Sequence, residues 1–179
     1  MLYPSDIEEA HELWGANCGP CSLAAVLDLS VSDVRGLLDG FESRGYTNPT
    51  QLKDALDRAR VKYRSIGPSL PHYGLAFIQW GGHESKPINV QYRFTHWIGI
   101  AGDVVFEVNA PHLTTFESWK EIMPEAIKEE GHGNGKFTVR AGIEIFGGFE
   151  AAALNLSQKR RISNGYKINI GSSDFRVDF

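Results

Sequence analysis

The spacing of apolar residues changes once along the chain, near residue 61, and this change constrains the fold more than any other feature. Before it, apolar residues recur at helical spacing, as at Leu52, Ala55 and Leu56. After it, short apolar runs rich in aromatic and β-branched residues favour strands. These runs occupy residues 74–80, 94–100 and 104–108. Helices followed by strands, without regular alternation, predict an α+β fold in which N-terminal helices pack on a mainly antiparallel β-sheet.

Local signals place the helix starts. Capping residues, or proline in a first helical turn, mark four of them in the first third of the chain. They are Ser5, with an end near Gly15; Gly19-Pro20, with an end near Leu27; Ser32; and Asn48-Pro49. Later, a helix interrupted at Pro124 is predicted over residues 115–129, and a further strand over residues 136–146.

Length and composition bound the class of protein. A chain of 179 residues, 42% hydrophobic and 22% charged, fits one globular domain. We expect that domain over residues 1–146, with residues 147–179 as a C-terminal extension, a candidate β-hairpin, packed on it. The net charge of -4 gives no reason to expect nucleic-acid binding. The acidic start and the absence of an 18-residue apolar run predict a cytoplasmic protein without membrane attachment.

Two cysteines three residues apart, Cys18 and Cys21, are the first candidates for chemistry. Cys18 is predicted at a helix N-terminus, where unpaired N–H groups and the helix dipole stabilise a thiolate. Cys21 shares a helix face with Ala24 and Ala25 and is expected to be a core residue. A zinc site would need two further ligands at suitable spacing, so no metal or cofactor is predicted.

His96 is the candidate base, because the sequence offers it a partner. If Gly102-Asp103 forms a two-residue hairpin turn, counting outward from the turn places His96 directly opposite Asn109. Directly opposed side chains on one face lie close enough for an Asn oxygen to accept from an imidazole N–H. Asp103 lies at the turn, about 20 Å from His96 at roughly 3.3 Å per residue, which makes it a poor partner. A shift of one residue would remove this pairing.

The segments around these residues resemble a known family. The run from Asn17 to Leu27, NCGPCSLAAVL, is similar to the nucleophile helix of papain-like peptidases of the bacteriocin-leader-processing (double-glycine) kind and of phytochelatin synthases. The runs THWIGI, residues 95–100, and VVFEVNAP, residues 104–111, resemble the family's His strand and following acid strand. The resemblance covers roughly residues 5–146 and implies a papain-like fold, a peptide or protein substrate, and a Cys18-His96-Asn109 triad, with Asn where the family usually has Asp.

The same resemblance implies a position for the oxyanion donor. The family commonly has a Gln six residues before the nucleophile, and this chain has Glu12 there. An ionised carboxylate cannot donate a hydrogen bond. The Cys18 backbone N–H and a second donor, Asn17 or Trp14, would then be needed, and losing one donor can cost ~10²–10³ in rate.

Three functions are compatible with these residues. The first is a cysteine-dependent hydrolase or acyltransferase acting on an amide or thioester. The second is thiol–disulfide exchange, because Cys18-Gly19-Pro20-Cys21 is the thioredoxin tetrapeptide, although a thioredoxin fold needs a strand leading into it. The third is a catalytically weak or inactive binding protein on a papain-like scaffold. The sequence does not determine the oligomeric state.

Overall fold

A computed structural model describes residues 18–82, 94–109 and 113–146, together with residues 10, 12 and 14. Its helices are α2 (Cys18–Leu27), α3 (Val31–Arg35), α4 (Phe41–Arg44), α5 (Pro49–Arg58) and α6 (Phe116–Glu129). Its strands are β1 (Lys62–Gly67), β2 (Tyr73–Trp80), β3 (Thr95–Ala101), β4 (Val104–Phe106), β5 (Leu113–Thr115) and β6 (Phe137–Phe146). Residues 10, 12 and 14 are helical, as predicted. The rest of that first predicted helix and the C-terminal extension lie outside the described residues.

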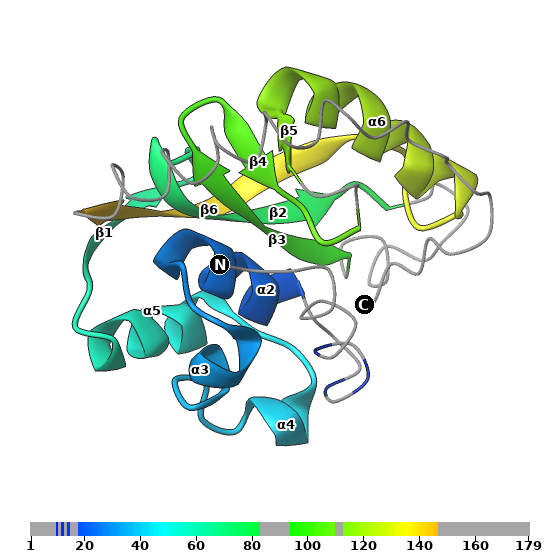
Figure 1. Cartoon of the computed structure of the whole chain (residues 1–179). Helices are drawn as coiled ribbons and strands as arrows, with labels where there is room; N and C mark the ends of the chain where they lie inside the picture. The colour runs from blue at the N-terminus through cyan, green and yellow to red at the C-terminus, as the bar shows by residue number, and fades with distance from the viewer. Residues whose placement is uncertain are drawn as a thin grey trace, which may run out of the picture.

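The strands form one six-stranded sheet in the order β1-β6-β2-β3-β4-β5, and every neighbouring pair is antiparallel. Helices α2 to α5 cover one face of this sheet and α6 covers the other (Figure 1). Each interface has its own hydrophobic core. The predicted α+β class, with N-terminal helices on an antiparallel sheet, is confirmed.

Two helix starts show how capping chemistry fixes the local structure. At α5, the predicted start at Asn48 is confirmed, and Asn48 and Gln51 exchange hydrogen bonds between side chain and backbone. At α3, the prediction of Ser32 as the cap is wrong, since the cap is Ser30. Its hydroxyl accepts from the Asp33 N–H at 3.1 Å, while the Asp33 carboxylate accepts from the Ser30 N–H at 3.2 Å. Arg35 is the third residue after Ser32, and its guanidinium cannot accept a hydrogen bond from a cap N–H as the Asp33 carboxylate does.

The structure differs from the predicted elements in further places. The strand predicted over residues 104–108 ends at Phe106, and neither α4 nor β5 was predicted. Helix α6 continues through Pro124, where a break was expected. Buried Trp119, Met123 and Ile127 hold α6 on the sheet on both sides of this proline. Tertiary contacts therefore outweigh the local cost of the missing N–H group.

Close packing joins α2 to the sheet and fixes where Cys18 lies. The Ser22 hydroxyl donates to the Trp97 carbonyl at 3.0 Å, which ties α2 to β3. A Cβ at Gly99 would lie only 3.1 Å from the Val26 side chain, so glycine permits this approach. Gly19 likewise lies directly against the Thr47 side chain, with no room for a Cβ. The start of α2 is therefore clamped between β3 and the loop before α5.

Candidate functional site

The hairpin between β3 and β4 has the predicted turn. Ala101 pairs with Val104 across Gly102-Asp103, and the pairing continues to Gly99 and Phe106. The ladder then stops, so the pairing does not extend outward to His96 and Asn109. The turn prediction is confirmed, but the partner that it implied for His96 depends on strand pairing that β4 does not continue.

The imidazole of His96 instead pairs with Glu107. The His96 Nε2 and Glu107 Oε1 atoms are 2.6 Å apart, and the side chains are 3% and 0% exposed. If the ladder continued, Glu107 would face Ile98, one diagonal step from His96 on the same face of the sheet. Diagonal neighbours are about 7–8 Å apart at Cα, a span that a long glutamate side chain crosses.

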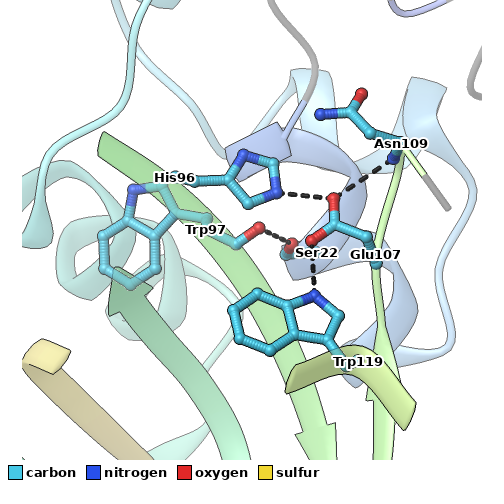
Figure 2. Close-up of polar contacts among 6 residues, drawn as sticks. All are labelled: Ser22, His96, Trp97, Glu107, Asn109 and Trp119. Carbon is cyan, nitrogen blue, oxygen red and sulfur yellow. Dashed lines mark hydrogen bonds and ion pairs between the residues drawn. The ribbon is translucent and has the colours of Figure 1, made fainter. Parts of the chain in front are cut away.

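Three donors converge on the Glu107 carboxylate (Figure 2). Oε1 accepts from His96 and also from the Asn109 backbone N–H at 3.1 Å, while Oε2 accepts from the Trp119 indole N–H at 2.9 Å. Asn109 thus supports the site through its backbone. This corrects the expected side-chain pairing of Asn109 with His96, because the β3–β4 ladder stops before Asn109 and Glu107 pairs with His96 instead.

Cys18, at the start of the helix on the face opposite α6, contacts the same imidazole. It is the first residue of α2 and is half-buried. Its side chain forms a hydrogen bond with His96 that helps to raise the pKa of the imidazole. Because Nε2 of His96 is engaged by Glu107, Nδ1 is the nitrogen left for Cys18. Residues 18, 96 and 107 come from separate elements, and the fold brings all three side chains together.

The charges of this cluster are linked. Burial disfavours the imidazolium, but the charge of Glu107 and the charge and hydrogen bond of Cys18 outweigh it, so the pKa of His96 lies well above its usual value. Burial likewise disfavours the Glu107 carboxylate, yet the charge of His96 and the three hydrogen bonds lower the pKa of Glu107. Each charge therefore favours the ionised form of its partner.

The remaining predicted residues lie as follows. Cys21 is fully buried in the core, as expected from its helix face, and no disulfide links it to Cys18. Glu12 is helical and exposed, and Asn17 lies outside the described residues. Trp14 packs edge-on against Phe41, and its buried indole N–H has no hydrogen-bond partner within the described part of the chain.

Two site residues were missed by sequence reasoning, Glu107 and Trp119. Glu107 carried a signal, since it is the one charged residue in the apolar run over residues 104–108, and a buried acid requires partners. Trp119 carried none. It belongs to a helix on the far face of the sheet, and its contact with Glu107 arises only when the two layers pack.

The fold and the site together define an α+β protein with a buried His-Glu pair beside a cysteine at a helix start. Comparisons with family models, with curated proteins and with solved structures find no match for the chain. No helix within the described ranges is long and apolar enough to cross a membrane. Over the same ranges, no group of three His, Cys, Asp or Glu residues is arranged to hold a metal ion. The residues described before Cys18 are helical, whereas a thioredoxin fold would place a strand there.

Proposed function

We propose that this protein is a cysteine-dependent hydrolase or acyltransferase of the papain-like class. Cys18 is the nucleophile, His96 transfers the proton, and Glu107 orients the imidazole. The observation that carries this assignment is the position of the His96 side chain, which contacts Cys18 and the buried Glu107 carboxylate at once. A nucleophile, a base and a group that orients the base are the three parts that covalent acyl transfer requires.

The residues suggest a concrete sequence of steps. The Cys18 thiolate attacks the carbonyl carbon of an amide or thioester, and the carbonyl oxygen becomes an oxyanion. The first N–H groups of a helix have no partner within it, so the Cys18 backbone N–H is available as a donor. The His96 imidazolium then protonates the leaving group, and the acyl group remains on sulfur. Water or another acceptor, deprotonated by His96, releases it.

The Glu107 carboxylate is held in a fixed orientation beside His96. A carboxylate with three hydrogen-bond donors has little freedom to turn, and its burial keeps water from competing for His96. The charge also stabilises the imidazolium that forms when Cys18 is a thiolate. The resemblance of residues 17–27 and 95–111 to leader-processing peptidases supports a peptide or protein substrate.

Alkylation of the thiol tests the assignment directly. Iodoacetamide or an acyl probe should modify Cys18 of the wild-type protein, and peptide mass spectrometry locates the modified residue. The variant His96→Gln should react roughly 10²–10⁴ times more slowly with the acyl probe, because the proton carrier is gone. Glutamine retains a donor for Glu107, which limits the destabilisation that an unpaired buried carboxylate would cause.

The control is His72→Ala, which removes an exposed histidine elsewhere on the chain. It should react as the wild type does, and circular dichroism should show that both variants are folded. Equal acylation rates in His96→Gln and the wild type would exclude His96 from the chemistry and the function with it.

A further inference from the structure

Cys21 is a second thiol that the proposed function does not use. It lies in the first turns of α2, three residues after Cys18, and is fully buried while Cys18 is half-buried. We propose that Cys18 and Cys21 form a reversible intramolecular disulfide when the protein meets a small disulfide oxidant such as oxidised glutathione. The reversible bond is a modification of the nucleophile, distinct from acyl transfer.

Helical geometry brings the two residues within bonding range. Residues i and i+3 of an α-helix have Cα atoms about 5 Å apart, from a rise of roughly 1.5 Å and a turn of about 100° per residue. Disulfides join Cα atoms roughly 4.4–6.8 Å apart. Gly19 lies tightly against Thr47, and Pro20 has a fixed φ, so the turn that carries both thiols is held in place.

The difference in exposure orders the steps. A solvent-borne disulfide reaches Cys18 first, and the Cys18 thiolate displaces one glutathione thiolate to give a mixed disulfide. Cys21 then attacks the Cys18 sulfur from within the helix turn and needs no path to solvent. The second glutathione leaves and takes up the Cys21 proton. Two protein thiols are thereby oxidised to one disulfide, and one oxidised glutathione is reduced to two thiols.

The local environment favours this exchange. A helix N-terminus and a neighbouring imidazolium both stabilise a thiolate, and thiolates are the attacking species in disulfide exchange. If the proposed function holds, closing the bond blocks the nucleophile, and a dithiol reductant restores it.

The experiment uses the full chain in buffers of oxidised and reduced glutathione. After an acid quench, remaining thiols are labelled with a maleimide and intact masses are measured. The wild type should lose both thiols together and carry no glutathione, and dithiothreitol should restore both. The variant Cys21→Ala should instead accumulate one glutathione on Cys18.

Two results would overturn the disulfide. One is a stable glutathione adduct on the wild type. The other is a wild type that keeps both thiols under conditions in which Cys21→Ala has reacted fully. Because Cys21 is buried, circular dichroism should be used to check that Cys21→Ala is folded, and Cys21→Ser serves as a second variant. The acyl probe separates the two ideas. The acylation rate of Cys18 in reduced Cys21→Ala bears on the hydrolase, and we expect it to equal the wild-type rate. The mass measurement bears on the disulfide alone and does not depend on activity.

Discussion

At the scale of single residues, the Glu107 carboxylate decides the electrostatics of the site. It is fully buried, accepts from His96, Asn109 and Trp119, and is the negative charge that offsets the burial of the imidazolium. A neutral amide in its place would keep the shape but lose the charge. His96 would then be easier to deprotonate, because only the Cys18 side chain would still favour its charged form.

We therefore expect Glu107→Gln to shift the pH dependence of Cys18 acylation. Loss of the imidazolium limits the reaction on the alkaline side, and that limit should move to lower pH in the variant because the pKa of His96 falls. The rate at neutral pH should drop by roughly 10²–10⁴. Rates of acyl-probe labelling across the pH range measure both effects. An alkaline limit identical to that of the wild type would show that Glu107 does not control the imidazole.

The same pair predicts a pH dependence of stability. The pKa of His96 is raised above 6.5, so its contribution is complete below that value and is lost as pH rises through the raised pKa. The pKa of Glu107 is lowered below 4.5, so its contribution is complete above that value and is lost as pH falls through the lowered pKa. Both contributions are complete between pH 4.5 and pH 6.5, so the stabilisation by the ion pair should be greatest there.

Denaturant unfolding at a series of pH values tests this, with the double variant His96→Gln, Glu107→Gln as the reference without charges. The difference in free energy of unfolding, wild type minus variant, should decline above the usual histidine range by about 1.4 kcal/mol for each unit of pKa shift. A difference that is constant across the whole range would contradict the ion pair.

At the scale of elements, the contact between α2 and its neighbours sets the position of the nucleophile. Gly19 and Gly99 allow backbone to approach side chains, and the Ser22 hydroxyl fixes the height of α2 along β3. The Trp97 indole N–H donates to the Thr47 carbonyl at 3.2 Å, so β3 also holds the loop that presses on Gly19. A small change at Gly19 should therefore disturb Cys18 beside it.

We expect Gly19→Ala to lower the free energy of unfolding by about 1–3 kcal/mol, because the new methyl group would overlap the Thr47 side chain. Acylation of Cys18 should slow in the folded fraction. The matched control is Gly36→Ala, where the nearest atom is 3.6 Å from the new Cβ and φ is -66°. That variant should be neutral or more stable by about 0.4–1 kcal/mol. Equal effects at both positions would argue against the clamp.

At the scale of the whole molecule, the site joins the two helical layers through the sheet. Cys18 starts a helix on one face, while Trp119 belongs to α6 on the other, and the His96-Glu107 pair connects them (Figures 1 and 2). The site is complete only when both layers are packed. Substitutions in α6 should therefore change the reactivity of Cys18.

The variant Trp119→Phe tests that connection. Losing the indole N–H leaves Glu107 Oε2 without its donor and should cost about 1–3 kcal/mol of stability. It should also raise the pKa of Glu107 and move the acidic limit of Cys18 acylation to higher pH. Trp80→Phe, in the same core and 5.6 Å from Trp119 between ring centroids, should lower stability without moving that limit. A pH profile unchanged in Trp119→Phe would show that α6 acts on packing alone.

Residue order along the chain accounts for the features that depend on near neighbours. These are the α+β class, the start of α2 at Cys18, the cap at Asn48 and the two-residue turn after β3. Capping, helix spacing and turn chemistry involve residues a few positions apart, so they can be read directly from their order. The candidates Cys18 and His96 followed from the same local patterns.

Long-range packing, in contrast, places Glu107, and not the Asn109 side chain, against His96. That choice depends on where the β4 ladder stops and on the reach of a side chain across a diagonal, and neither follows from counting residues along an ideal hairpin. The indole of Trp119 becomes a donor to the site only after α6 packs against the sheet. The chain order specified the thiol and the imidazole, and the packing of two layers selected the carboxylate, because a buried charge is stable only where several distant donors converge on it.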